Sequence, residues 1–338
     1  MNTEKTVTTQ QWQDQEALRR FQLISPLLQT GLDDAQRLHL RKKIAEENNI
    51  TKAAEKLFIT QSALNQQLLK LEKELGTPLF HRSRTNWRLT EAGEIYIEGA
   101  KAALQIKNTT YNRIYDVVSA RKGHLTIGLT PGRGLRMFTS IYPELHRSFP
   151  NLDVRPIEMR VRAQQDAIAK GDIDVGLMTL TQKDQTSDTY YPLKQEELVL
   201  IIPSGHPLAE KAAPSGEPLT TLDLTELRYE PFVLMDKTST LRSSCDLLFE
   251  KAGFAPNILF ETNNTSGIAA MVQSTLCCGI IPRYYTLGLT EGVACFSLPE
   301  RPSWEIVISC QKNGYLNSGA REFIRLAREY WENSAPLF

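Results

Sequence analysis

The sequence predicts an α-helical winged helix-turn-helix domain joined by a long linker helix to an α/β domain of two parallel-sheet subdomains. Three patterns support this fold class: apolar residues at helical spacing over 34–75, one apolar residue in every seven over 91–120, and short β-branched segments that alternate with helices beyond 123. The predicted parts are an N-terminal extension (1–33), the helix-turn-helix domain (34–90), the linker helix (91–120) and the α/β domain (121–338).

The N-terminal domain should contain two helices joined by a very short turn, after a first helix over 35–47. The third helix should run over Gln61–Leu75, because Thr60 can cap its first turn and Gly76 can end it in the left-handed conformation. The helix before it, over 52–57, carries small residues that allow close crossing. The residues expected to face inward are Ala53, Ala54, Leu57, Ile59, Leu64, Leu68 and Leu71.

The same domain carries a local excess of positive charge. The whole chain has a formal net charge of zero, but residues 40–90 contain ten basic and five acidic residues. This asymmetry is typical of a nucleic-acid-binding module joined to a module with another task. The polar, basic stretch 81–88 predicts a hairpin-like wing. In it, Trp87 would either brace the wing or lie along a sugar backbone.

The start of the third helix should enter the DNA major groove, where polar side chains can distinguish all four base pairs. Basic side chains around it would neutralise phosphates without reading sequence. The expected base contacts are Gln61, Ser62, Asn65 and Gln66, and the expected phosphate contacts are Lys52, Lys70, Arg82, Arg84 and Arg88.

A long amphipathic helix follows the wing, with Thr90 as its cap. A helix of this length with a single apolar seam needs a partner helix, which predicts a dimerising linker. The alternative is a seam that packs against its own domain. The residues expected at the dimer seam are Ile97, Leu104, Tyr111 and Val118.

The α/β domain should contain two subdomains, about 121–195 with 298–338 and about 196–297, with a ligand cleft between them. The expected strands lie near 125–129, 154–158, 173–177, 198–202, 232–234, 258–261, 279–281 and 306–310, and the expected helices near 135–149, 163–170, 241–252, 266–273 and 318–331.

Hydroxyl-rich segments follow several of these strands at helix starts, where free N–H groups suit an anion. Each hydroxyl could instead be a plain helix cap. Arg133, if it points inward, would favour a carboxylate or phosphate, and so a small, anionic metabolite. The expected effector-binding residues are Thr130, Arg133, Thr179, Thr238, Ser239, Thr240 and Thr265.

Enzyme motifs are absent from the sequence: it has no Walker loop, no GxSxG, no HExxH and no GxGxxG that opens a helix. We therefore expect neither catalysis nor a cofactor. A cytosolic solute-binding module with a basic tether is the alternative from another class. No apolar run approaches the length of a membrane span and no secretory segment is visible, which predicts a cytoplasmic protein with no membrane partner.

The five cysteines lack zinc-ligand spacing, so we expect no metal site. Reduced, mostly buried thiols are the expected state. A redox sensor at the adjacent Cys277 and Cys278 is the alternative.

Several motifs resemble those of the LysR-type transcriptional regulators over about residues 35–335. The N-terminal motifs are Thr51-Lys52-Ala53-Ala54-(x2)-Leu57-(x2)-Thr60-Gln61-Ser62-Ala63-Leu64, Leu71-Glu72-(x2)-Leu75-Gly76-(x2)-Leu79-Phe80-(x)-Arg82 and Leu89-Thr90-(x)-Ala92-Gly93. The C-terminal motifs are Gly123-(x)-Leu125-(x)-Ile127-Gly128, Phe149-Pro150, Asp172-(x)-Asp174, His206-Pro207-Leu208-Ala209, Ala252-Gly253-Phe254 and Gly279-Ile280-Ile281-Pro282.

This resemblance implies a sequence-specific regulator that binds an imperfect palindromic operator in double-stranded DNA as a homodimer or homotetramer. It also implies a periplasmic-binding-protein-like effector domain, a small-molecule effector and RNA polymerase as a partner. The sequence departs from the family at Asn65 and Gln66, where the family usually has serine and then a basic residue.

Overall fold

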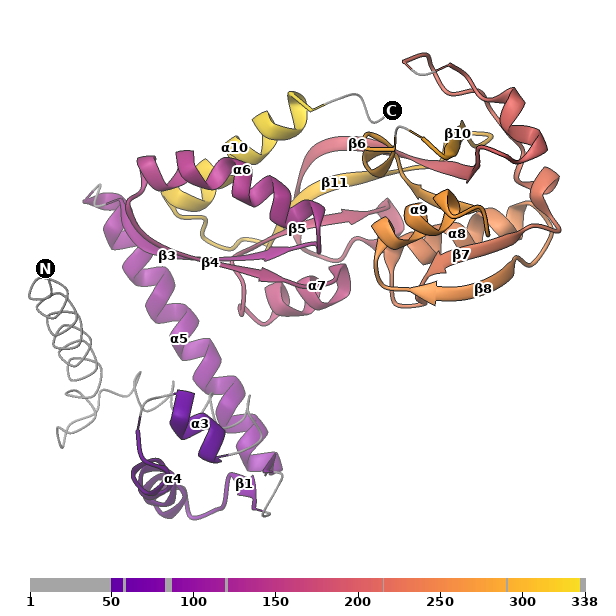
Figure 1. Cartoon of the computed structure of the whole chain (residues 1–338). Helices are drawn as coiled ribbons and strands as arrows, with labels where there is room; N and C mark the ends of the chain where they lie inside the picture. Colours follow the sequence, from indigo (N-terminus) through magenta and orange to yellow (C-terminus); the bar gives the residue numbers. More distant parts are fainter. Residues whose placement is uncertain are drawn as a thin grey trace, which may run out of the picture. The chain divides into compact units, whose positions relative to one another are not determined.

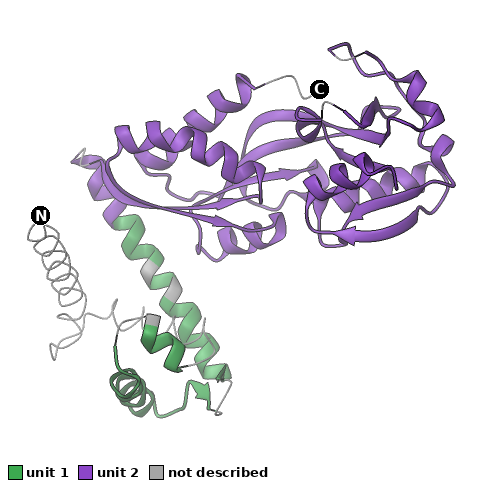
Figure 2. Ribbon diagram, viewed as in Figure 1, with its two compact units in different colours: residues 1–110 green, residues 111–338 purple. Residues whose placement is uncertain are grey.

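The computed structural model describes residues 50–56, 59–82, 87–118, 121–214, 216–289 and 291–334. The chain divides into two compact units, shown in different colours in Figure 2. Unit 1 ends at Thr110 and unit 2 begins at Tyr111, so the boundary falls within one long helix. The predicted extension over 1–33, the predicted helix over 35–47 and Leu57 lie outside the described residues.

The predicted third helix has its expected bounds, whereas the helix before it begins at Ile50, two residues before the predicted start. Helix α3 (Ile50–Lys56) precedes α4 (Gln61–Leu75). The hydroxyl oxygen of Thr60 accepts a hydrogen bond from the main-chain nitrogen of Ala63 and so caps α4. At the other end, Gly76 has a φ of 71° and its N–H donates to the carbonyl of Glu72. A residue with a Cβ is strained in this conformation, which explains the glycine.

A small apolar core holds these helices to a two-stranded wing. Strand β1 (Phe80–His81) pairs antiparallel with β2 (Arg88–Leu89), as the hairpin-like pattern predicted. Thr90 then caps the long helix α5 (Glu91–Val117) by accepting from the main-chain nitrogen of Gly93. The buried residues of this core are Ile50, Ala53, Ala54, Leu64, Leu68, Leu71, Leu79 and Phe80.

In unit 2, three parallel strands form the centre of a first lobe, lobe I. Strand β3 (Lys122–Leu129) lies between β4 (Asn151–Glu158) and β5 (Val175–Leu180). Helices α6 (Arg133–Ser148) and α10 (Ser318–Glu332) pack against each other on one face of this sheet (Figure 1). Helix α7 (Val161–Ala169) packs on β5 on the opposite face. Lobe I is therefore a three-layer α/β structure.

Strand β6 (Thr189–Pro203) runs through both lobes. Its first part pairs antiparallel with β11 (Ser303–Cys310), which in turn pairs antiparallel with β5. Its second part belongs to the other lobe. The sheet is thus mixed, because the strands that connect the lobes run against the parallel strands predicted from the strand–helix alternation.

The second lobe, lobe II, is completed around the end of β6. Strands β9 (Gly279–Pro282) and β10 (Val293–Ser297) pair with it antiparallel, and β10 was missing from the predicted strands. The remaining elements of lobe II are a parallel pair, β7 (Pro231–Met235) and β8 (Asn257–Thr262), the helices α8 (Thr240–Lys251) and α9 (Thr265–Gln273), and the 3-10 turns η2 (Pro207–Lys211), η3 (Leu224–Leu227) and η4 (Arg283–Thr286). The 3-10 turn η1 (Gln182–Asp184) follows β5 in lobe I.

Two consecutive glutamates, Glu196 and Glu197, are fully buried on β6 where it passes from lobe I to lobe II. Glu197 accepts hydrogen bonds from Arg283 at 3.0 Å and from Arg301 at 2.8 Å. Burial raises the pKa of this carboxyl, but the hydrogen bonds outweigh burial and leave the pKa below its usual value. The segment of β6 that connects the lobes therefore carries buried carboxylates, and arginine side chains compensate the charge of Glu197.

None of the helices in the described part of the chain combines the length and the apolar character that crossing a bilayer requires.

Candidate functional site

The outer face of α4 carries the four predicted base-contacting residues. Gln61, Ser62 and Gln66 are exposed and Asn65 is half-buried, whereas the opposite face of the helix contributes to the core of unit 1. The hydroxyl of Ser62 lies 3.2 Å from that of Thr60, so part of its hydrogen-bonding capacity serves the cap. This face offers amide groups at the start of a helix, the chemistry suited to base edges.

The predicted phosphate-contacting residues fall into two groups. Lys52, Lys70 and Arg88 are exposed, and Arg84 lies outside the described residues. Arg82 instead forms an ion pair with Glu72, whose other carboxylate oxygen accepts from the main-chain nitrogen of Leu79 at 2.8 Å. The pair therefore ties the base of the wing to α4, a structural role that the sequence pattern did not indicate.

Trp87 packs inside the wing. Its ring centroid lies 5.8 Å from that of Phe80, and the guanidinium of Arg82 lies 5.5 Å from the Trp87 ring. These contacts favour the bracing role over a contact with a sugar backbone.

Helix α5 exposes apolar side chains on both sides of the unit boundary. Of the predicted seam, Tyr111 and Val118 are exposed and Ile97 is buried, while the side chain of Leu104 lies outside the described part. Exposed apolar side chains that the seam prediction did not include are Ile95, Ile106 and Val117. The seam as a dimer interface stays a prediction.

A cavity of about 460 Å³ lies between lobe I and lobe II. This size is in the range of small-molecule sites. Although they are far apart in the sequence, all seven predicted effector-binding residues line it: Thr130, Arg133, Thr179, Thr238, Ser239, Thr240 and Thr265. Lining residues that the sequence reasoning missed include Glu158, Arg160, Tyr285 and Trp304.

The sequence position of Arg160, shortly after a strand of the parallel sheet, could have indicated its place at the cavity. Strands β3, β4 and β5 are parallel, so their carboxyl ends share one edge of the sheet. Thr130 and Thr179 were predicted from this position on β3 and β5. Arg160 follows β4 at the same edge, and the same reasoning applied to β4 finds it.

Helix starts from lobe II contribute to the cavity, and some of their hydroxyls are caps. The Ser239 hydroxyl accepts from the nitrogen of Leu241 at 3.2 Å and so caps α8. The Thr240 hydroxyl instead donates to the carbonyl of Thr179 at 3.2 Å and so links the two lobes. The buried hydroxyl of Thr130 has no hydrogen-bond partner among the described residues.

Arg133 does point inward, but its charge is already compensated. Its Nη1 donates to the buried carboxylate of Glu196 at 2.5 Å. That carboxylate also accepts from the indole nitrogen of Trp304 at 2.6 Å and the main-chain nitrogen of Tyr284 at 3.0 Å. The guanidinium also lies within 5.4–5.8 Å of the Tyr284, Tyr285 and Trp304 ring centroids. Its position therefore stabilises the wall of the cavity.

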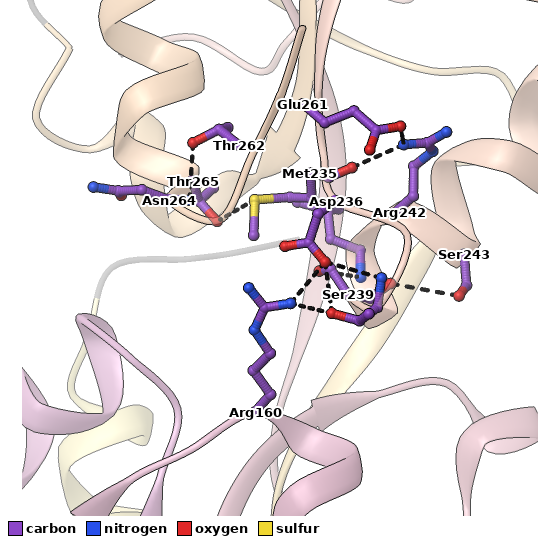
Figure 3. Close-up of polar contacts among 12 residues, drawn as sticks. Arg160, Met235, Asp236, Ser239, Arg242, Ser243, Glu261, Thr262, Asn264 and Thr265 are labelled. Atoms are coloured by element: carbon purple, nitrogen blue, oxygen red, sulfur yellow. Dashed lines mark hydrogen bonds and ion pairs between the residues drawn. The ribbon is translucent and has the colours of Figure 1, made fainter.

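Arg160 bridges the cavity from the other side. It precedes α7 in lobe I, and its Nη1 donates to Asp236 of lobe II at 2.7 Å and to the Thr238 hydroxyl. Figure 3 shows its side chain extending toward Asp236. The hydrogen bond from Arg160 holds the pKa of the Asp236 carboxyl well below its usual range. Asp236 is therefore an anion at neutral pH.

The adjacent cysteines are buried in the core of lobe II. Cys277 and Cys278 are free thiols, and burial raises the pKa of both, that of Cys278 to about 12. Because the thiolate is the reactive form, this environment disfavours redox chemistry. The geometry supports the interpretation of these residues as structural thiols.

A winged helix-turn-helix followed by a two-lobed α/β domain with a cavity between the lobes defines a class of ligand-responsive transcriptional regulators. Residues 35–94 match the family model described as bacterial regulatory helix-turn-helix protein, lysR family. Residues 119–332 match the model described as LysR substrate binding domain. The chain belongs to the LysR family of DNA-binding transcriptional regulators.

Relatives extend along most of the chain. The HTH-type transcriptional regulator YcgK of Bacillus subtilis is 28% identical over 308 residues, which cover 88% of this chain and 94% of YcgK. The regulator AlsR of the same organism is 28% identical over 241 residues, covering 71% of this chain and 77% of AlsR. Among solved structures, full-length OxyR from Pseudomonas aeruginosa has a TM-score of 0.63 at 20% identity and covers 90% of this chain and 96% of its own. The LysR-family regulator CbnR has a TM-score of 0.59 at 20% identity, covering 88% and 98%.

Proposed function

We propose that this LysR-type regulator binds a specific DNA operator through α4 and that a small, anionic metabolite in the cavity between the lobes modulates operator binding or activation. The observation that carries the proposal is the convergence of seven predicted residues from both lobes on one cavity. Such a ligand changes the protein's state only through different affinities for two conformations. Closure of the lobes supplies that difference in affinity. Thr130 and Thr240 belong to different lobes, so a ligand contacts both of them only when the lobes are closed.

The DNA half of the proposal rests on the exposed amide face of α4. Full-length CbnR, which shares this fold, has been solved with its target DNA. The operator of this protein can be found by sequencing the DNA fragments that the purified protein retains. Gln61→Ala should then weaken operator binding by about 1–3 kcal/mol and leave binding to random DNA almost unchanged. Equal losses on both DNAs would contradict the base-reading role.

Lys70→Ala is the matched variant on the same helix. It should weaken binding to all sequences and reduce the slope of log affinity against log salt concentration by about one unit, because a phosphate contact carries no sequence information. Salt titrations by fluorescence anisotropy measure the slope. A sequence-dependent loss for Lys70→Ala would place this residue among the base contacts instead.

The sensor half is tested by a thermal-shift screen of carboxylates, phosphates and aromatic acids on the full chain. A ligand at about one hundred times its dissociation constant should stabilise the protein by about 2.7 kcal/mol. Thr130→Val and Thr240→Val remove one hydroxyl from each lobe with little change in side-chain size. A ligand that still raises the melting temperature of both variants binds elsewhere. A screen in which no compound raises the melting temperature of the wild type contradicts the sensor role.

We also propose a homodimer or homotetramer assembled through α5, with RNA polymerase as the partner in activation. The support is the exposed apolar surface of α5, which a second helix would cover. Tyr111→Glu with Val118→Glu should produce monomers in analytical ultracentrifugation and lose tight operator binding, because linked binding of two half-sites is then impossible. A dimer that persists places the interface on another surface.

A further inference from the structure

Two arginines line the cavity, but only one has a guanidinium that a ligand can reach. The side chain of Arg133 is 4% exposed and that of its partner Glu196 is 0% exposed. A ligand anion that took Arg133 from this partner would leave a buried carboxylate uncompensated, which is strongly unfavourable. The side chain of Arg160 is 41% exposed. An anion in the cavity therefore meets Arg160 at lower cost.

The guanidinium of Arg160 also has unused donors. A guanidinium carries five N–H groups. Within the described part of the chain, only Nη1 has hydrogen-bond partners, namely Asp236 and the hydroxyl of Thr238. The donors on Nε and Nη2 have no acceptor there, but an anion at these donors would lie beside the Asp236 carboxylate, which repels it. The planar fork of the guanidinium is therefore open to a carboxylate or phosphate only when Asp236 has moved away.

Asp236 already occupies an anion position at Nη1 of Arg160. Its Oδ1 accepts from the main-chain nitrogen of Thr238 at 2.9 Å, from the Thr238 hydroxyl at 2.5 Å and from Arg160 at 2.7 Å. One guanidinium, one hydroxyl and one main-chain N–H thus converge on a single carboxylate oxygen. This set of donors is the one that a free carboxylate in the cavity would need.

On the basis of the proposed function, we propose that Arg160 is the residue that recognises the anionic group of the effector, and that the Asp236 carboxylate is an internal competitor that holds Arg160 in the ligand-free protein. The proposal moves anion recognition from Arg133 to Arg160. It also identifies a strap between the lobes, because Arg160 belongs to lobe I and Asp236 to lobe II.

The competition has a measurable consequence. A fraction of the protein in which Asp236 has released Arg160 is competent to bind, and the apparent dissociation constant is the intrinsic constant divided by that fraction. Asp236→Asn keeps the shape of the side chain and removes its charge, so it should release Arg160. The variant should therefore bind anions more tightly than the wild type, which is the reverse of what a merely structural ion pair predicts.

Calorimetric titration of the full chain with sulfate and with succinate, at constant ionic strength in chloride, tests the proposal. We expect Asp236→Asn to bind at least one of these anions about tenfold more tightly than the wild type. Arg160→Gln and the double variant Arg160→Gln/Asp236→Asn should lose this binding. Matched controls are Arg162→Gln and Asp166→Asn, exposed on the same helix α7, which should behave as the wild type. Circular dichroism checks that each variant is folded.

Three results would overturn the proposal: equal anion affinities in the wild type and Asp236→Asn, binding that survives Arg160→Gln, or no anion binding to folded Asp236→Asn. The proposed function fails separately. A metabolite whose binding is lost in Thr130→Val and Thr240→Val but unchanged in Arg160→Gln overturns the role of Arg160 and keeps the cavity as the sensor site.

Discussion

Arg133 and Arg160 line the same cavity and each pairs with a carboxylate, yet the two pairs differ in every property that matters for binding. The Arg133–Glu196 pair is buried, and its charges are compensated by an indole, a main-chain nitrogen and three aromatic rings. The Arg160–Asp236 pair is partly exposed and joins the two lobes. The comparison teaches that the burial of the partner carboxylate distinguishes an arginine with a structural role from one that can bind a ligand.

Unit 1 contains an intermediate case. The side chain of Arg82 is 35% exposed and its partner Glu72 is 9% exposed. Glu72 also accepts from the main-chain nitrogen of Leu79, so its loss would leave a buried donor without an acceptor. The three pairs therefore rank by burial, and substitution of each acid tests whether the rank predicts the effect.

The largest loss of stability is expected for Glu196→Ala. The substitution leaves the Arg133 charge buried and unpaired, which should lower the free energy of unfolding by about 3–5 kcal/mol. Urea denaturation followed by circular dichroism measures the loss. Asp236→Ala is the matched variant, with an expected loss of about 0–1 kcal/mol. Similar losses for the two variants would break the distinction between the pairs.

A smaller loss is expected for Glu72→Ala in the helix-turn-helix unit. The free energy of unfolding should fall by about 1–3 kcal/mol, because the Leu79 N–H loses its acceptor. The same denaturation experiment measures this effect, and the operator affinity should fall because the base of the wing is released. Lys73→Ala, an exposed change on the same helix, is the control. Full stability in Glu72→Ala would mean that water replaces the carboxylate.

The smallest expected effect is a change in the free energy of unfolding at acidic pH. Since the folded-state pKa of Asp236 lies below its usual value, the pair stabilises the folded protein above about pH 4 and loses this contribution as the pH falls. The difference in unfolding free energy between wild type and Asp236→Asn should therefore be constant near neutral pH and shrink below about pH 4. A difference that persists unchanged in acid would show that Asp236 contributes through packing rather than through its charge.

Local sequence rules were sufficient for the helices and for most strands. Thr60 and Gly76 mark the ends of α4 because a capping hydroxyl and a left-handed glycine act within a few residues of themselves. Hydroxyl-rich segments after parallel strands were enough to predict seven cavity residues, because parallel strands place their carboxyl ends at a common edge. Strand β10 (Val293–Ser297) was missed, because its sequence VACFS has neither a run of β-branched residues nor a clear apolar–polar alternation.

The sequence alone determined the class of fold, the ends of α4 and most of the chain segments that meet at the cavity, because each follows from interactions between neighbours or from the geometry of regular elements. The tertiary structure decided which arginine is reachable. Arg133 meets Glu196 across 63 positions and Arg160 meets Asp236 across 76, so neither pairing has a local signal. Burial of one pair and exposure of the other arise only when β6 carries Glu196 between the lobes, and this burial separates a structural guanidinium from one that can bind a ligand.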